Sequence, residues 1–276
     1  MMRDRLLQIR ELLALDGSVW VHLDDTEVHR ARCMLDKVFG PENFVATIVW
    51  EKTTSARNDA HHFSVDQDYI VVYAKEKTLF SPNGLTRTAS ADAAYRNPDE
   101  DLRGPWREGD YKCGKTADER PNLYYPLTHP VSGNEVWPPR TSVWRYSKEE
   151  HQRHVNENLL WWGSTGNYRF PKIKRFRSTV SDTSVPRTLW MADEVDQTRR
   201  AKQAIQALLP GITPFATPKP ERLLHRIISI ATNAGDVVLD PFVGSGTTAA
   251  VAHKMGRRWV AVEREADTVS NTHCPG

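Results

Sequence analysis

The strongest constraint on the fold is a short apolar run followed by a glycine-rich turn, VVLDPFVGSGTTAA at residues 237–250. Its first three residues are typical of a strand that is covered on both faces. Gly244 and Gly246 allow a sharp turn and a close approach of the backbone to a ligand. A second apolar run, residues 259–262, leads directly to Glu263. This order of strand, turn, helix, strand and acid is typical of half of a nucleotide-binding α/β unit.

The spacing within this stretch leaves several interpretations open. Gly244-x-Gly246-x-x-Ala249, with Glu263 following the next apolar run, matches a loose dinucleotide-binding fingerprint. An ordinary glycine turn between a strand and a helix has the same spacing. A Walker phosphate loop is excluded, because no Gly-Lys-Ser/Thr follows the glycines. In a nucleotide site, the carboxylate of Glu263 would accept hydrogen bonds from two ribose hydroxyls.

The string Asp-Pro-Phe-x-Gly-Ser-Gly-Thr-Thr at residues 240–248 resembles motif I of the amino-methyltransferases that modify DNA. The resemblance implies S-adenosylmethionine as cofactor, with its methionine part in the turn and its ribose on the later acid. TPKPERLL at residues 217–224 resembles motif X of the same family, where the turn before a helix closes over the methionine end. The residues that the resemblance predicts to bind the cofactor are Thr217, Lys219, Pro220, Asp240, Phe242, Gly244, Ser245, Gly246, Thr247 and Glu263.

The N-terminal part of the chain shows regular apolar periodicity. Asp24 and Asp25 can be interpreted as catalytic or metal-binding acids, but Asp24 with Glu27 fits better a capping box before a helix. The series RLLQIRELLALDGSVWVHLDD, VFGPENFVATIVWEK and FSVDQDYIVVYAK resembles the segment after the catalytic motif in type III restriction-modification methylases. The pattern predicts helices over residues 3–15 and from the Asp24 cap through Val38, and strands over residues 18–23, 44–51 and 68–75.

Residues 81–215 are rich in Pro, Gly, Asn and Arg and have poor apolar periodicity, apart from a predicted helix at 199–209. The stretch YRFPKIKRFR at residues 168–177 holds five basic residues and no acid. Such a density of cations can neutralise phosphates, and neighbouring aromatic rings can stack on bases. A solvated basic hairpin over a small aromatic core is the structural alternative. With the family resemblance, the stretch predicts DNA contacts by Arg169, Lys172, Lys174, Arg175 and Arg177.

The Asp/Asn/Ser-Pro-Pro-aromatic motif of the resembled family does not occur in the sequence. In that family the motif hydrogen-bonds the target amino group and stacks on the flipped base. Trp137-Pro138-Pro139-Arg140 has the prolines without the other two residues, and we interpret it as a loop. We expect the motif upstream of Met1, so no catalytic residue is assigned. Without its strand, we expect strands 18–23 and 237–239 either to pair directly or to leave two open edges.

Composition limits the remaining choices. The chain has 276 residues, a formal net charge of +2 and three cysteines without a Cys-x-x-Cys pair. This pattern disfavours a zinc site or a disulfide framework, so we expect no metal and a cytoplasmic location. The sequence shows no signal-peptide core and no apolar run of membrane-spanning length, so no membrane partner is expected.

The combined prediction is an α/β protein: an incomplete Rossmann-like S-adenosylmethionine-dependent methyltransferase sheet with an irregular α+β target-recognition insert. Residues 1–80 would form the catalytic-side half of the sheet, residues 81–215 the insert, and residues 216–276 the cofactor-binding half. By resemblance, the intact enzyme would methylate double-stranded DNA in a restriction-modification system, at adenine N6.

The resemblance also implies a restriction endonuclease subunit and a second methylase chain as partners. We expect this chain alone to transfer no methyl group. A DNA-binding fragment that needs a complementing chain, and an NAD-dependent oxidoreductase, remain as alternatives.

Overall fold

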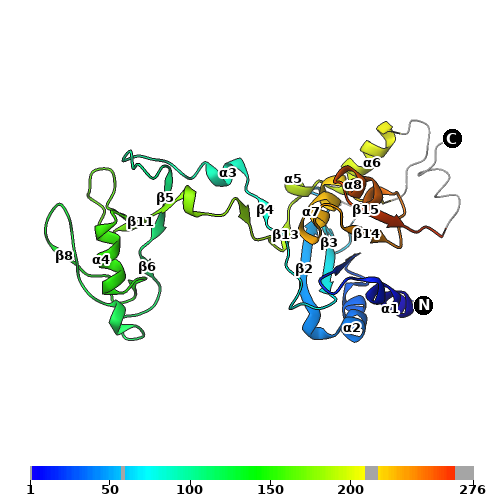
Figure 1. The fold of residues 1–276 in the computed structure, drawn as a ribbon, viewed down its shortest axis with the longest axis horizontal. Helices are drawn as coiled ribbons and strands as arrows, with labels where there is room; N and C mark the ends of the chain where they lie inside the picture. The colour runs from blue at the N-terminus through cyan, green and yellow to red at the C-terminus, as the bar shows by residue number, and fades with distance from the viewer. Residues whose placement is uncertain (1, 57–59, 209–216, 265–276) are drawn as a thin grey trace. The chain divides into compact units, whose positions relative to one another are not determined.

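The computed structural model describes residues 2–56, 60–208 and 217–264, and the chain divides into two compact units (Figure 1). The first unit consists of Met1–Leu85 and Val185–Gly276, and the second consists of Thr86–Ser184. The second unit is therefore shorter at both ends than the predicted insert of residues 81–215. Its boundaries follow the packing, because the chain returns to the core of the first unit soon after residue 185.

The described residues of the first unit form two sheets. The larger sheet has the strand order β1-β3-β2-β13, and β14 and β15 form a separate parallel pair. The elements of this unit are α1 (Met2–Leu12), β1 (Ser18–Leu23), α2 (Val28–Phe39), the 3-10 helix η1 (Pro41–Asn43), β2 (Phe44–Glu51), β3 (Gln67–Ala74), β13 (Leu189–Trp190), α5 (Ala192–Val195), α6 (Thr198–Leu208), α7 (Glu221–Ala231), β14 (Val237–Asp240), α8 (Thr247–Lys254) and β15 (Arg258–Ala261).

Strand β3 lies between β1 and β2 and is antiparallel to both. Successive residues of a strand point to opposite faces of its sheet. Ile70 and Val72 accordingly pack in one cluster with Leu223 of α7, while Val71 and Tyr73 pack in the cluster formed with α1 and α2. The sheet is thus covered on both faces, which explains why β3 reads as a nearly continuous apolar run.

The β14–β15 pair has no hydrogen-bonded strand in common with the larger sheet among the described residues. Helix α7 connects the two sheets instead. Its Leu223 packs on the larger sheet, and its Ile228 packs against Val251 and Ala252 of α8. Direct pairing of the strands at residues 18–23 and 237–239 is therefore wrong, because a helix layer and not a strand joins the two parts.

The second unit is built from short strands around aromatic side chains. Strand β11 is antiparallel to β10 and β5, and a buried cluster contains Tyr111, Trp144 and Ile173. The elements are β4 (Leu85–Thr86) at the boundary, α3 (Ala89–Asp92), β5 (Trp106–Asp110), β6 (Lys112–Cys113), the 3-10 helix η2 (Pro121–Leu123), β7 (Leu127–Thr128), β8 (Glu135–Val136), β9 (Val143–Trp144), α4 (Lys148–Asn156), β10 (Leu160–Trp161), β11 (Lys172–Phe176), the 3-10 helix η3 (Arg177–Thr179) and β12 (Thr183–Ser184).

The acids after β1 form a turn and not the predicted capping box. The carboxylate of Asp24 accepts hydrogen bonds from the backbone and the hydroxyl of Thr26. Glu27 precedes α2 without a side-chain cap bond. The Asp24 carboxylate thus binds the nearby Thr26 hydroxyl, whereas the capping-box pattern predicts that it binds a backbone N–H at the start of the helix.

Candidate cofactor and DNA-binding sites

The predicted glycine turn connects β14 to α8. Gly244 and Gly246 have φ angles of 50° and 77°, and Gly246 caps the N-terminus of α8. This left-handed backbone favours glycine, which has no Cβ to collide with the following carbonyl. At the start of the turn, Oδ1 of Asp240 accepts a hydrogen bond from the backbone N–H of Phe242 at 3.1 Å. The Ser245 hydroxyl lies 2.9 Å from that of Thr247 within the same turn.

Glu263 lies just beyond β15 and reaches back to this turn. Its Oε2 accepts a hydrogen bond from the backbone N–H of Gly244 at 3.0 Å. The carboxyl ends of parallel strands meet at one edge of a sheet, so the acids Asp240 and Glu263 come to the same edge. Phe242 is half exposed beside them, with the Arg5 guanidinium 5.3 Å from its ring centroid. Carboxylates, a glycine turn and an exposed ring fit a nucleoside-bearing ligand.

The predicted motif X residues directly precede α7. Pro220 is the N-cap residue of this helix, and Thr217 is exposed. The Nζ atom of Lys219 lies 3.7 Å from Oδ2 of Asp68 and 5.8 Å from the ring centroid of Trp50. Lys219 is therefore tied to the edge of the larger sheet, through a carboxylate that the sequence did not single out.

Asp68 gathers three basic side chains at this edge. Its Oδ1 lies 2.7 Å from Nζ of Lys52, and its Oδ2 lies 2.9 Å from Nε2 of His22. Burial of Asp68 opposes its ionisation, but hydrogen bonds from His22 and Lys52 outweigh burial and hold its pKa at about 2. Burial lowers the pKa of Lys219, while the charge of Asp68 opposes that shift. The outcome is a mostly buried polar cluster centred on one ionised carboxylate.

The basic stretch at residues 168–177 does not form one cationic surface. The Lys174 side chain is 1% exposed and its Nζ lies 2.9 Å from Oδ2 of Asp101. Arg177 pairs with Asp92 and Asp182, at 3.0 Å and 2.7 Å. Lys174 shares its face of β11 with the buried Phe176. Lys174 is thus engaged inside the fold and Arg177 in two ion pairs, which counts against both as phosphate ligands.

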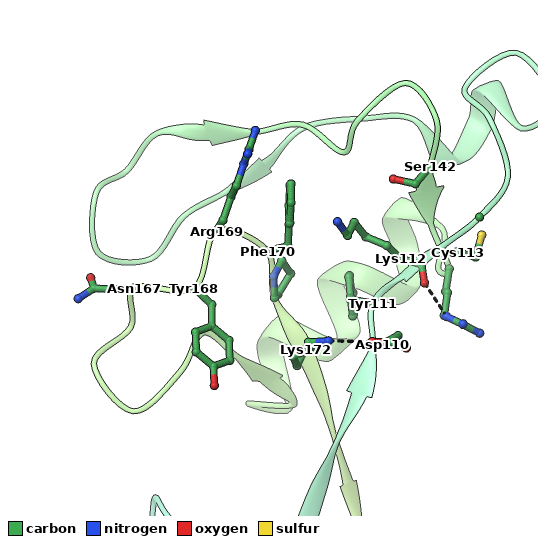
Figure 2. A pocket seen from close by; sticks show the side chains of 13 residues that line it. Asp110, Tyr111, Lys112, Cys113, Ser142, Asn167, Tyr168, Arg169, Phe170 and Lys172 are labelled. Atoms are coloured by element: carbon green, nitrogen blue, oxygen red, sulfur yellow. Dashed lines mark hydrogen bonds and ion pairs between the residues drawn. The ribbon is translucent and has the colours of Figure 1, made fainter.

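The other three residues of the predicted DNA-binding set lie on the surface. Arg169 and Arg175 are exposed, and Lys172 forms an ion pair with Asp110 at 2.7 Å. Arg169 and Lys172 line a cavity of about 740 Å³ in the second unit (Figure 2).

Lys112 and Arg145 line the same cavity, and the sequence prediction missed them. Each stands away from the basic stretch in the sequence, and they come together because β6 pairs with β9. Lys112 is paired with Trp144, the residue before Arg145. No local charge pattern signals this arrangement.

The described part of the chain consists of residues 2–56, 60–208 and 217–264. No group of three or more His, Cys, Asp or Glu side chains there is placed to hold a metal ion. Within the same residues, no helix combines the length and the apolar character needed to cross a membrane.

The fold defines an incomplete Rossmann-like α/β protein, and sequence comparison gives its family. The N6/N4 methyltransferase model, described as DNA methylase, matches residues 1–272, so the chain belongs to this DNA methylase family. The type II methyltransferase M.EcaI of Enterobacter cloacae is 28% identical over 265 residues, which are 95% of this chain and 53% of that protein. The Mod subunit of the Salmonella typhimurium type III enzyme StyLTI is 30% identical over 254 residues, which are 90% and 36% of the two chains.

A solved structure supports the fold. The cytosine-N4-specific PvuII DNA methyltransferase superposes with a TM-score of 0.50 at 13% identity, covering 98% of this chain and 68% of that one. The predicted fold class, an incomplete Rossmann-like methyltransferase sheet, is confirmed. The present chain spans about half of the M.EcaI protein and about a third of the StyLTI Mod subunit.

Proposed function

We propose that this chain carries the cofactor-binding and DNA-binding parts of a DNA amino-methyltransferase that modifies adenine N6. The observation that supports a nucleoside cofactor best is the hydrogen bond between Glu263 and Gly244, which brings the acid to the glycine turn. The cofactor that fits the family is S-adenosylmethionine, which supplies the methyl group when it is bound. The choice of adenine rests on the similarity to the Mod subunits of type III enzymes.

In this proposal different residues of the first unit contact different parts of the cofactor. Glu263 accepts hydrogen bonds from the ribose, and Phe242 offers an apolar face. The turn around Gly244 and Gly246 lets the backbone approach the methionine part, and Lys219 adds a cation at the same end. The remaining cofactor-lining residues in the proposal are Thr217, Pro220, Asp240, Ser245 and Thr247.

The second unit is proposed as the part that contacts double-stranded DNA, through the exposed side chains of Arg169, Lys172 and Arg175. The StyLTI relative is a subunit of a restriction-modification enzyme, which supports a restriction endonuclease subunit as partner. A second methylase chain and a cytoplasmic location belong to the same proposal through the family resemblance. The sequence contains no Asp/Asn/Ser-Pro-Pro-aromatic motif. We therefore propose that this polypeptide by itself binds its ligands and transfers no methyl group.

Tryptophan fluorescence can test the cofactor. Titration with S-adenosylhomocysteine should give saturable binding that is tighter than binding of NAD. Glu263→Ala should weaken it about tenfold, since hydrogen bonds to a charged acceptor are worth about 1.5–3 kcal/mol. Glu42→Ala, which removes an exposed acid from the same unit, serves as the control. Tighter binding of NAD would instead support the oxidoreductase alternative.

A second assay tests the reaction. The chain is incubated with methyl-labelled S-adenosylmethionine and mixed-sequence duplex DNA, and no protein-dependent label should enter the DNA. Saturable labelling would contradict the proposed inactivity of the isolated chain. The base that carries the label would then distinguish adenine N6 from cytosine N4.

A further inference from the structure

The cavity in the second unit concentrates positive charge (Figure 2). Its lining includes four basic side chains and one carboxylate, that of Asp110. The basic side chains come from three separate segments of the chain, and they are Lys112, Arg145, Arg169 and Lys172. Like charges that share a concave surface repel one another, so an anion bound among them is favoured.

We propose that this cavity binds a phosphodiester group of the DNA backbone through Lys112, Arg145 and Arg169. The proposal rests on the proposed function, because it takes DNA as the ligand of this unit. It differs from the sequence prediction in its residues: the phosphate contacts centre on Lys112 and Arg145, and Lys174 and Arg177 take no part.

Lys112 is held in place for such a contact. Its Nζ lies 3.5 Å from the ring centroid of Phe170, a cation–π distance that restricts the position of the ammonium group. Figure 2 shows the Lys112 side chain directed toward this ring. Burial lowers the pKa of Lys112, and the neighbouring charges of Arg169 and Lys172 lower it further. A bound phosphate would relieve this repulsion and stabilise the charged form of the lysine.

Arg145 is also oriented by the fold. Its Nε donates a hydrogen bond to the backbone carbonyl of Lys112 at 2.9 Å. This bond uses one of the five N–H donors of a guanidinium group, and the planar fork suits a phosphate oxygen pair. The same bond ties the Arg145 guanidinium to the backbone of the strand that carries Lys112.

Lys172 and Asp110 form an ion pair that reduces the net positive charge of the cavity. Their ion pair at 2.7 Å neutralises Lys172 in part, and the carboxylate of Asp110 repels an incoming phosphate. A variant of Asp110 is therefore expected to change phosphate binding in the opposite direction from variants of the basic residues. Its replacement by Asn should strengthen phosphate binding, whereas the loss of Lys112 and Arg145 should weaken it.

Salt dependence tests the proposal with the full-length chain and a fluorescent mixed-sequence duplex. Each phosphate contact contributes about 0.9 to the slope of log affinity against log salt concentration. The double variant Lys112→Ala/Arg145→Ala should lower the slope by about 1, because both cations are proposed to contact the same phosphodiester group. The matched control Lys115→Ala/Arg140→Ala removes two exposed cations of the same unit that pair with Glu119 and Asp118, and it should leave the slope unchanged.

The outcomes separate this proposal from the broader one. If the wild-type chain binds DNA and the double variant has the same slope, the cavity is not a phosphodiester site. The broader proposal that the second unit binds DNA then still stands. A wild-type chain that binds S-adenosylhomocysteine and no DNA removes the DNA role of the whole unit. Competition by inorganic phosphate at low millimolar concentration, without an effect of either variant on DNA, would assign the cavity to a free phosphate. If the double variant does not fold, Asp110→Asn decides, since weaker or unchanged DNA binding contradicts the proposal.

Discussion

The Nζ atom of Lys174 lies 2.9 Å from Oδ2 of Asp101, and both side chains are almost completely buried. A second carboxylate, that of Asp99, pairs with the same ammonium group. Lys174 belongs by sequence to the most basic stretch of the chain, yet its charge is used within the second unit. Its role is to neutralise two acids, which leaves the exposed arginines and the cavity lysines as the candidates for DNA contact.

Replacement of Lys174 should therefore affect folding and not DNA recognition. Lys174→Ala leaves two carboxylates without their shared cation, and the loss of one partner of a buried pair costs about 3–5 kcal/mol. We expect the free energy of unfolding of the second unit to fall by about that amount in urea titrations. The salt slope of DNA binding should stay at the wild-type value at low temperature, where the variant is folded.

Lys172→Ala is the matched comparison, because Lys172 is two residues away on the same strand with its side chain 35% exposed. It should change stability by less than about 1 kcal/mol, as is usual for a surface pair. A Lys174→Ala variant that is as stable as Lys172→Ala and binds DNA less tightly would restore Lys174 to the DNA-binding set.

The stability of the first unit should depend on acid through Asp68. The pKa of Asp68 is held at about 2 in the folded chain, below the value of about 3.9 in an unfolded one. The unfolded state thus binds more protons at low pH, so this contribution is present above pH 4 and is lost as the pH falls toward 2. It amounts to about 2–3 kcal/mol.

Asp68→Asn should remove this part of the acid sensitivity. Urea unfolding followed between pH 2.5 and 6 should show a flatter dependence for Asp68→Asn than for the wild-type chain. Asp66→Asn, two residues earlier, should retain the wild-type curve. Parallel curves for Asp68→Asn and the wild type would show that other carboxylates control acid unfolding.

Two stretches with capping-box spacing differ in the structure, and only the one that the sequence analysis did not single out forms the box. Ser147 and Glu150 form both bonds of a capping box at the start of α4. Asp24 and Glu27 have the equivalent spacing, but the Thr26 hydroxyl binds the Asp24 carboxylate first. Local spacing predicted the strands and helices of the first unit closely, because their apolar periodicity is satisfied by the sheet and the helix layers.

Site residues that meet only through long-range strand pairing or packing could not be predicted from the sequence. The glycine turn and Glu263 are separated by one helix and one strand, so a local α/β rule brought them together. Lys112 and Arg145 meet only because β6 pairs with β9, and that pairing has no signal in the sequence. Asp68 likewise gains its partners from residues that follow β2 and precede α7.

The backbone of the glycine turn provides a test that does not involve charge. Gly246 has a φ angle of 77° at the first residue before α8, and a Cβ there costs about 1 kcal/mol or more. Gly246→Ala should lower the free energy of unfolding by about that amount and weaken S-adenosylhomocysteine binding. Gly114→Ala, where an added Cβ meets nothing within 4 Å, should change neither. Unaltered cofactor affinity in Gly246→Ala would place the ligand away from the turn.

We expect the cluster of Lys219 and Asp68 to bind the carboxylate at the methionine end of the cofactor. S-adenosylhomocysteine carries a carboxylate that 5′-methylthioadenosine lacks, while both share the adenosine and the thioether. If Asp68 positions the Lys219 ammonium against that carboxylate, Lys219→Ala should reduce the preference for S-adenosylhomocysteine about tenfold, the scale of one charge-assisted hydrogen bond. Asp68→Asn should reduce it in the same direction, because the ammonium loses its anchor.

In both variants the affinity for 5′-methylthioadenosine should stay close to the wild-type value, since the proposal assigns the ribose to Glu263 and gives Lys219 only to the methionine end. A general loss of structure would lower both affinities together, so the ratio isolates the role of the cluster. Lys254→Ala, which removes a cation paired with Glu221 on the neighbouring helix, supplies the control for charge alone. An unchanged ratio in Lys219→Ala would show that the ammonium serves only to balance Asp68 within the fold.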